Sequence, residues 1–129
     1  MSDRAKMDAF LSAWPYARFL GLQAAEEGEG VTAVLPFSAR LVGNPLIPAL
    51  HGGVVGGFLE LAALAELAAK SPDGHAPRTV DITIDYLRPA RDQTTYARAE
   101  VIKRGRRVAN IQVTAWQDNR ATPDRKSVV

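Results

Sequence analysis

The chain of 129 residues has no cysteine, few aromatic residues and no long uninterrupted hydrophobic run apart from one glycine-containing stretch. Without cysteine there can be no disulfide, no thiolate nucleophile and no cysteine-ligated metal site. Aromatic residues make up 7% of the chain and are poorly interleaved with basic ones, which argues against a stacking platform for nucleic acid. The opening MSDRAKMDAF has no apolar segment of the kind that a signal peptide needs. We therefore expect a cytoplasmic protein that neither spans a membrane nor binds nucleic acid.

The charge is nearly balanced, with a formal net charge of +2, but it is unevenly distributed. Residues 103–107 read Lys-Arg-Gly-Arg-Arg and lie between two predicted strands. Such a turn is usually a solvated hairpin tip, although arginine side chains also match the oxygens of a phosphate. Both interpretations stay open, and a local anion site fits the pattern better than a surface coated with nucleic acid.

The length and the apolar fraction of 47% predict a single domain over residues 1–129 with a core of its own. An N-terminal helix is expected over about 3–14, where Trp14-Pro15 stops it, because the residue before proline avoids helical geometry. A second helix is expected from about Gly52 to Lys70. Strands are predicted over residues 19–26, 31–37, 79–87, 94–103 and 108–117, with a weak signal for a last strand from Lys126.

The helix from Gly52 is apolar nearly all round, so we expect other elements to enclose it. It contains two acids, and Glu66 has Lys70 four residues on, the spacing of a solvent-facing ion pair. Glu60 has no such companion. Because burying a bare carboxylate is costly, an acid in this position is commonly hydrated within a binding site or has a functional role. The alternative is an acid that faces solvent at a groove or bonds to a backbone donor.

Glycines surround the start of this helix. His51-Gly52-Gly53 leads into it, and the free N–H groups and positive dipole of a helix start favour an anion or a polarised carbonyl. The glycine pair could also simply permit a tight turn, and the two readings coexist because an oxyanion site needs close approach of the backbone. Gly56 and Gly57 each cost about 1 kcal/mol inside a helix, which indicates room made for a neighbouring helix or for an acyl chain.

Strands, then one enclosed helix, then meandering strands predict an α+β fold in which an antiparallel sheet wraps around a central helix. A small sheet with one helix leaves a face or an edge uncovered. Dimerisation is the natural way to cover it.

Several short sequence motifs occur in an informative order. Asn44 and His51-Gly52-Gly53 come first, Glu60 follows nine residues after the histidine, and Thr79-Val80-Asp81 and Tyr86-Leu87-Arg88-Pro89-Ala90 lie downstream. This order resembles the hotdog-fold acyl-CoA thioesterases of the phenylacetate-pathway type, over roughly residues 16–117. The resemblance implies hydrolysis of an acyl-CoA thioester to free acid and coenzyme A. It also implies a homo-oligomer, either a dimer or a dimer of dimers, and neither a cofactor nor a metal.

The resemblance carries the family's central roles onto individual residues. Glu60 matches the catalytic carboxylate, acting either as general base on water or as nucleophile on the thioester carbonyl. The backbone N–H of Gly53, with that of Gly52, would polarise this carbonyl. His51 would shape the helix start and contact the thioester region. The family often has aspartate where this chain has Glu60, and the longer side chain leaves both chemistries open.

Other matched residues lie farther from the carbonyl. Asn44 resembles the asparagine that positions the attacking water, although it stands seven residues before His51, one more than we expect for the family. Thr79 matches a hydroxyl residue that would approach Glu60 from the neighbouring subunit. The phosphates of coenzyme A would be contacted by Arg88, Arg104 and Arg106.

Two other functions fit the same pattern. A hotdog hydratase or dehydratase acting on an acyl thioester would pair a catalytic histidine with the acid, so His51 would then matter as much as Glu60. A non-catalytic acyl-CoA-binding domain would bind the ligand and release no thiol.

Overall fold

The structure is a computed structural model that describes residues 2–28, 30–46, 48–71, 77–117 and, by backbone alone, 125–128. Its helices are α1 (Asp3–Ala13), α2 (Pro15–Leu20), the short 3-10 helix η1 (Ala39–Leu41) and α3 (Gly52–Ala69). Its strands are β1 (Gln23–Glu27), β2 (Gly30–Leu35), β3 (Val42–Asn44), β4 (Ala49–Leu50), β5 (Thr83–Tyr86), β6 (Thr95–Arg104), β7 (Ala109–Trp116) and β8 (Arg125–Val128).

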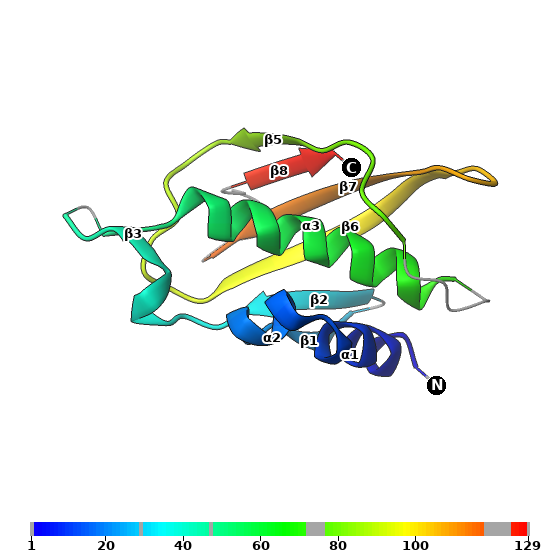
Figure 1. The fold of residues 1–129 in the computed structure, drawn as a ribbon, viewed down its shortest axis with the longest axis horizontal. Coiled ribbons are helices and arrows are strands. Elements are labelled where there is room, and N and C mark those ends of the chain that lie inside the picture. The colour runs from blue at the N-terminus through cyan, green and yellow to red at the C-terminus, as the bar shows by residue number, and fades with distance from the viewer. Residues whose placement is uncertain (1, 29, 47, 72–76, 118–124, 129) are drawn as a thin grey trace.

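Six of the strands form one antiparallel sheet in the order β1-β2-β6-β7-β8-β5, and β3 pairs with β4 in a separate two-stranded sheet. Figure 1 shows α3 lying along the large sheet, with β5 and β8 on one side of it and α1 and α2 on the other. The predicted α+β hotdog architecture, a sheet wrapped around a central helix, is therefore confirmed.

Helix α3 forms the centre of the core. Its buried positions are Val55, Phe58, Leu59, Leu61, Ala62, Ala63, Leu64, Ala65 and Ala69. The helix is also long and apolar enough to cross a membrane, with a mean hydropathy of 1.5, but half of it is buried inside the protein. This burial against the sheet fits a core helix, because enclosure by protein explains an all-round apolar composition without lipid.

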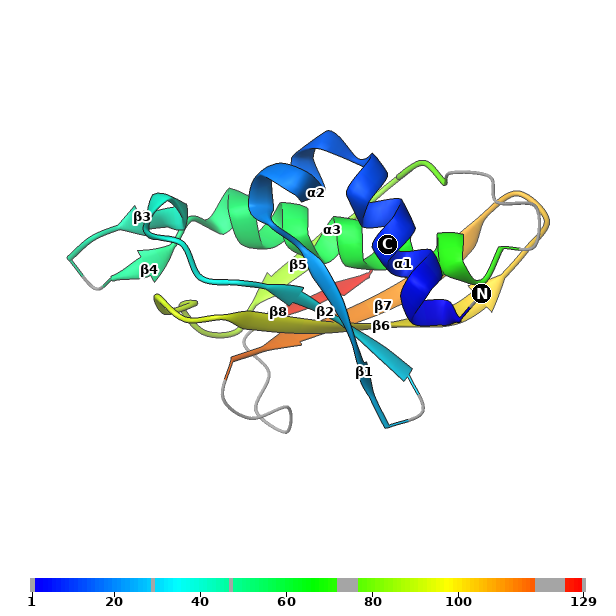
Figure 2. The same cartoon turned by 90° about the horizontal axis from the view of Figure 1, so that it is seen from below.

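The N-terminal region differs from the prediction. The strand expected from residue 19 begins only at Gln23, because residues 15–20 form α2. Pro15 occupies the start of this helix, where a missing N–H is not needed. Gly21 ends it with a φ of 73°, in the left-handed region that glycine adopts without strain. Figure 2 shows α1 and α2 together covering one flank of α3.

The strand predicted over residues 79–87 is also shorter than expected, since β5 spans Thr83–Tyr86 alone. Its predicted apolar face is not buried: Val80 is 86% exposed and Tyr86 is 51% exposed. By contrast, Val31, Ala33 and Leu35 of β2 are buried, as their alternation predicts. The segment after α3 therefore presents apolar side chains at the surface of this chain.

Candidate functional site

The candidate site begins at one stripe of α3. Gly53 and Glu60 are seven residues apart, which is about two helical turns and about 10 Å along the axis, so they lie on the same face. A helical side chain leans toward the N-terminus of its helix. This general tendency favours an approach of the Glu60 carboxylate toward the amides of the helix start.

His51 organises this helix start. It is the N-cap residue of α3, and its Nδ1 accepts a hydrogen bond from the Gly53 N–H at 3.0 Å. The Tyr86 hydroxyl donates to the Gly52 carbonyl oxygen at 3.1 Å, which ties β5 to the same turn. His51, Gly52 and Gly53 are all exposed. The predicted oxyanion amides thus lie at the surface, and one of them is currently bonded to the imidazole.

Glu60 lines a pocket of about 240 Å³ at the side of α3. The side chain is half-buried, and the structure gives it no ion pair among the residues it describes. The remaining lining residues are Trp14, Tyr16, Leu61, Leu64, Pro77, Arg78 and Thr79. A lone carboxylate in a mostly apolar pocket is the arrangement that the sequence predicts for Glu60.

Thr79 lines this pocket together with Glu60 of the same chain. The resemblance implied that Thr79 approaches Glu60 from a neighbouring subunit, which stays a prediction; within one chain the two residues already line the same pocket, because the chain returns along α3 at residues 77–79. The Thr79 Oγ1 is buried and has no hydrogen-bond partner in the described part of the chain. Leaving a buried hydroxyl unpaired costs about 1–3 kcal/mol, so this position favours a bound partner.

Gly56 and Gly57 let the walls of the site approach the helix. A Cβ on Gly57 would come within 2.8 Å of the Tyr16 ring of α2. A Cβ on Gly56 would lie 3.1 Å from Ile84 Cδ1 and 3.3 Å from the Tyr86 hydroxyl, both on β5. Gly56 and Gly57 therefore make room for α2 on one side and for β5 on the other. A neighbouring helix was one of the two predictions for this pair.

Asn44 is not brought to the Glu60 pocket. It ends β3, where its Oδ1 accepts a hydrogen bond from the Leu46 N–H at 3.0 Å and so stabilises a local turn. The side chain is exposed and is absent from the lining of the pocket. The structure therefore supports a turn-forming role for Asn44 and does not place it in the lining of the Glu60 pocket.

Comparison with known proteins assigns the family. The profile of the thioesterase superfamily matches residues 48–123, more than half of the chain. The chain is 32% identical to the medium/long-chain acyl-CoA thioesterase YigI of Salmonella typhimurium over 121 residues, which cover 82% of this chain and 77% of that protein. The chain belongs to the thioesterase superfamily.

Solved structures agree with this assignment. A crystal structure of a protein from Chromobacterium violaceum is 38% identical, has a TM-score of 0.77 and covers 98% of this chain and 88% of its own. A phenylacetic acid degradation-related thioesterase from Ralstonia eutropha JMP134 is 22% identical, has a TM-score of 0.78 and covers 95% and 96%. At 22% identity, the similarity to the second structure is evidence for the fold alone. The predicted membership in the hotdog thioesterases is thus confirmed.

In this thioesterase the three arginines predicted to contact phosphates do not lie together. Arg88 follows β5, whereas Arg104 and Arg106 belong to the β6–β7 hairpin at the opposite end of the molecule (Figure 1). Arg104 is bonded to the C-terminal end of α3, since its Nη1 donates to the Lys70 carbonyl oxygen at 3.2 Å and its Nη2 to Ser71 Oγ at 3.2 Å. Arg88 and Arg106 are exposed.

The structure adds residues that the motif did not identify. Arg78 lines the Glu60 pocket and also an adjoining pocket of about 350 Å³, which shares Leu64 and Pro77 and reaches Arg107 on the hairpin. Trp14, which the sequence places at the end of the N-terminal helix, lines the Glu60 pocket as well. The only sequence signal for Arg78 was its position directly before Thr79.

Proposed function

We propose that this protein hydrolyses acyl-CoA thioesters to a free acid and coenzyme A. The observation that carries the proposal is that Glu60 and Thr79 share one pocket on the face of α3 that begins at the Gly52 and Gly53 amides. The YigI relatives support it, since they are named medium/long-chain acyl-CoA thioesterases. By analogy with them, medium and long acyl chains are the substrates to try first.

The first part of the mechanism is polarisation of the thioester carbonyl. The N–H groups of Gly52 and Gly53 at the start of α3 would donate to its oxygen, a contribution of about 3 kcal/mol for each well-placed donor. Because His51 Nδ1 now accepts the Gly53 N–H, the carbonyl oxygen would share this donor or displace the imidazole. In this proposal His51 keeps the amide oriented while the site is empty.

The second part is attack on the carbonyl carbon. With Glu60 as general base, its carboxylate takes a proton from water, the hydroxide adds to the carbon, and the C–S bond breaks. The proton held by Glu60 then passes to the leaving thiolate, which gives coenzyme A and the free acid. With Glu60 as nucleophile, its oxygen adds to the carbon, the C–S bond breaks and the thiolate leaves; water then cleaves the resulting anhydride, which regenerates Glu60, releases the acid and supplies the proton that the thiolate takes up. The Thr79 hydroxyl would donate to Glu60 or to the incoming water in either case.

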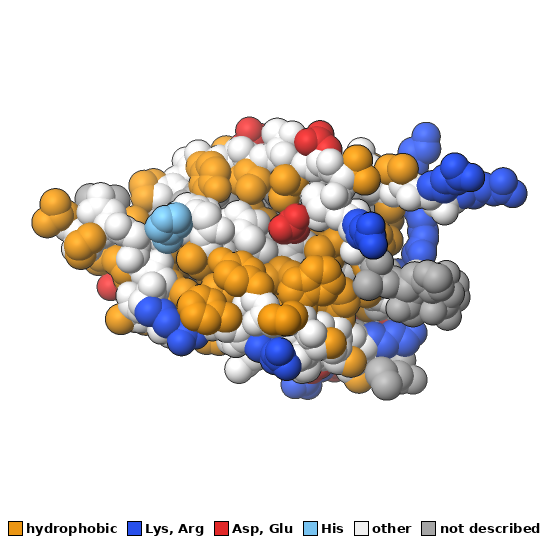
Figure 3. All heavy atoms as spheres, in the orientation of Figure 1, with side chains coloured by type: hydrophobic (Ala, Val, Ile, Leu, Met, Phe, Trp, Pro, Cys, Tyr) orange, Lys and Arg blue, Asp and Glu red, His pale blue; other side chains and the backbone are white. Residues whose placement is uncertain are grey.

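We also propose that a second copy of the chain covers the face around the site. Tyr16 and Phe19 of α2 are 41% and 55% exposed, and Val80 and Tyr86 beside α3 are more than half exposed. Figure 3 shows hydrophobic side chains gathered on this face over α2 and α3. In a dimer, β5 would also be protected as an edge of the sheet. Whether two such dimers pair into a tetramer stays a prediction, as does the cytoplasmic location.

A dimer would also bear on the predicted binding of coenzyme A. Arg88 and the β6–β7 hairpin lie at opposite ends of one chain, so we propose that a nucleotide is contacted by Arg88 of one copy and Arg106 of the other. Arg104 would have to leave Lys70 and Ser71 before it could join them.

Sedimentation or light scattering of the purified protein tests the interface. The expected mass is that of a dimer or a tetramer. Val80→Lys should shift it toward the monomer, because it places a charge in the apolar face. Ile102→Lys is the matched control, since Ile102 is 54% exposed on β6, away from this face. A wild-type protein that is monomeric at micromolar concentration would contradict the proposed interface.

Thiol trapping tests the function itself. The protein is mixed with acyl-CoA substrates of short, medium, long and aromatic acyl groups, and the released thiol is followed by absorbance, with Glu60→Gln as the impaired control. We expect thiol release that the variant lacks. A hydratase would instead change the enoyl absorbance without releasing thiol and would lose as much activity in His51→Ala as in Glu60→Ala. A binding domain would show thermal stabilisation by acyl-CoA and no thiol.

A further inference from the structure

A second cavity lies on the far side of α3, where β2 separates from β6. The two strands pair only from Ala33–Ala97 to Leu35–Thr95. Beyond these pairs β6 continues to Arg104, while the start of β2, at Gly30 and Val31, turns away with the β1–β2 hairpin (Figure 2). The opening between the strands is a cavity of about 560 Å³, which we call the β2–β6 notch. This volume lies within the usual range for small-molecule sites.

The outer side of the notch is held by Arg98 in place of backbone pairing. Its Nη2 donates to the Glu27 carbonyl oxygen at 2.8 Å and to Thr32 Oγ1 at 3.0 Å. The Arg98 side chain is only 18% exposed, and Thr32 is 1% exposed. A side chain on Gly30 would displace the Arg98 guanidinium, because a Cβ there would fall within 2.3 Å of Arg98 Nη1. Arg98 thus holds the opening between the strands through its hydrogen bonds to Glu27 and Thr32.

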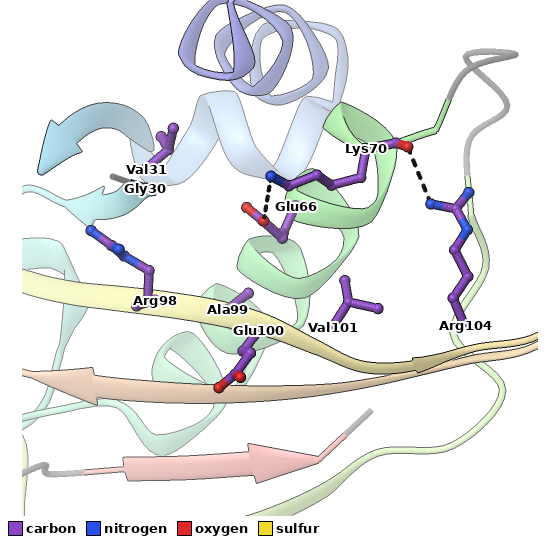
Figure 4. A pocket seen from close by; sticks show the side chains of 9 residues that line it. All are labelled: Gly30, Val31, Glu66, Lys70, Arg98, Ala99, Glu100, Val101 and Arg104. Carbon is purple, nitrogen blue, oxygen red and sulfur yellow. Dashed lines mark hydrogen bonds and ion pairs between the residues drawn. The ribbon is translucent and has the colours of Figure 1, made fainter. Parts of the chain in front are cut away.

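The interior of the notch combines an apolar floor with cationic sides. Val31, Ala99 and Val101 supply the floor. Figure 4 shows Lys70 on one side and Arg104 on another, joined by the hydrogen bond from Arg104 to the Lys70 carbonyl oxygen. Apolar surface with a few convergent charged groups is typical of a ligand site.

Glu66 is one of two acids that line this notch, and it does not face solvent, although the sequence predicts that it does. Its side chain is 14% exposed and its Oε1 lies 3.8 Å from Lys70 Nζ. Burial raises the pKa of Glu66 despite the nearby Lys70.

Two cations of the notch favour an anion as ligand, namely Lys70 at the end of α3 and Arg104 on β6. The third cation of the lining, Arg98, is already engaged by Glu27, whose Oε2 lies 3.9 Å from its Nη2, and the lining also contains the carboxylates Glu66 and Glu100. Glu100 alternates with the floor residues along β6 and extends away from Lys70 (Figure 4).

We propose that the β2–β6 notch binds a small amphipathic carboxylate, with its head on the side of the notch that Lys70 and Arg104 form and its apolar tail on Val31, Ala99 and Val101. None of these residues lines the Glu60 pocket, although the resemblance also assigns Arg104 to coenzyme A. The proposal therefore does not depend on catalysis at Glu60.

The pairing of Lys70 sets the expected strength of binding. Its Nζ already contacts Asp3 Oδ2 at 3.0 Å, which joins the start of α1 to the end of α3. A carboxylate ligand must compete with Asp3 for this cation. Removing the charge of Asp3 should therefore tighten binding, whereas removing that of Lys70 should weaken it.

Methyl-labelled NMR locates the ligand. Protein with ¹³C-labelled valine and leucine methyl groups is titrated with octanoate, and with 1-octanol and octyltrimethylammonium as uncharged and cationic probes. We expect saturable shifts of the Val31 and Val101 signals with octanoate, and weaker ones with the other two probes. Shifts confined to Leu61 and Leu64 would place octanoate in the Glu60 pocket alone and overturn the proposal. Equal binding of the cationic probe would overturn it as well.

Four charge variants test the head group. Lys70→Gln and Arg104→Gln should each weaken octanoate binding about three- to fivefold, the effect of one exposed ion pair. Asp3→Asn should tighten it by a similar factor. Lys103→Gln is the matched control on the same strand and should change nothing, because Lys103 does not line the notch. Loss of affinity in Lys103→Gln equal to that in Arg104→Gln would show a non-specific charge effect and contradict the site.

Discussion

The two acids of α3 lie six residues apart and have opposite surroundings. Glu60 shares an apolar pocket with Thr79, and the described residues offer it no ion pair. Glu66 lies in the β2–β6 notch with Lys70 3.8 Å away and two arginines in the same lining. One helix thus holds one acid without an ion pair among the described residues and another, more buried acid beside a lysine. The difference comes from what packs on each face, because the two residue types are the same.

The largest expected effect comes from neutralising each acid in turn. Glu60→Gln should lower kcat for acyl-CoA hydrolysis by about a hundredfold or more, the range for loss of a general base. Glu66→Gln should leave kcat within about twofold of wild type, because Glu66 lies outside the Glu60 pocket. Circular dichroism of both variants checks that they fold. Comparable losses in the two variants would erase the functional difference between the acids.

The next effect concerns the buried hydroxyl beside Glu60. Thr79→Val keeps the shape of the side chain and removes the unpaired Oγ1. We expect the free energy of unfolding to rise by about 1 kcal/mol, while kcat falls about tenfold. Urea denaturation and thiol release measure the two quantities, and Thr79→Ser, which keeps the hydroxyl, should retain more of the activity. Unchanged kcat in Thr79→Val would show that this hydroxyl takes no part in catalysis.

A smaller effect is expected at the glycine beneath Tyr16. Gly57→Ala removes a helix-disfavouring residue, worth about 1 kcal/mol. Its Cβ meets only the outer end of the Tyr16 ring, which is 41% exposed and free to shift. The variant should therefore be at least as stable as wild type but should have an altered KM, because Tyr16 lines the Glu60 pocket. In a Tyr16→Ala background the same change should leave KM unaltered; a persistent shift there would point to another cause.

The smallest effect is the pH dependence at Glu66. Burial raises the pKa of Glu66 above its ordinary value of 4.5. The folded state therefore binds this proton more tightly than the unfolded state. The contribution of Glu66 to stability is thus fully present below its unfolded pKa and is lost as pH rises through the folded one. Glu66→Gln should accordingly raise the free energy of unfolding at pH 8, by less than about 1 kcal/mol, and change it little near pH 4.

Neighbouring charges provide the control for this measurement. Lys70, Asp3 and Arg98 are the charged groups that act on Glu66. The hydrogen bond from Lys70 lowers the pKa of Asp3, so the Asp3–Lys70 pair stabilises the fold above the unfolded pKa of Asp3 and loses this effect as pH falls through its folded pKa. Glu100→Gln, an exposed carboxylate of the same notch, should show no such pH-dependent gain. Destabilisation by Glu66→Gln at pH 8 would mean that attraction to Lys70 outweighs burial.

Much of the fold could be predicted because its signals are local. The all-round apolar composition of residues 52–69 predicts an enclosed helix, and the alternation in β2 predicts its buried face. Helix α2 was missed because Pro15 read as a stop for α1, although proline also starts helices. The strand that contains Tyr86 was predicted too long. Alternation of apolar and polar residues indicates an extended segment, but it does not show which of its residues pair with another strand.

The candidate site likewise has a part that the sequence predicts and a part that it does not. The order of His51, Gly52, Gly53 and Glu60 was readable because two turns of one helix fix their relation. The proximity of Thr79 to Glu60 within one chain was not readable, because it depends on how the chain returns along α3. The role of Asn44 stays a prediction, and in this chain its side chain accepts a local hydrogen bond from Leu46.

By itself the sequence determined the central helix, most of the long strands, the acid at position 60 and the pairing of Glu66 with Lys70, because propensity, periodicity and helical spacing act over a few residues. Only the tertiary structure decided that the Glu66 side chain is largely buried while Lys70 stays exposed, and that β2 opens away from β6 at Gly30. These features depend on contacts between segments far apart in the chain, and no local pattern encodes what packs over Glu66 or where the two strands part.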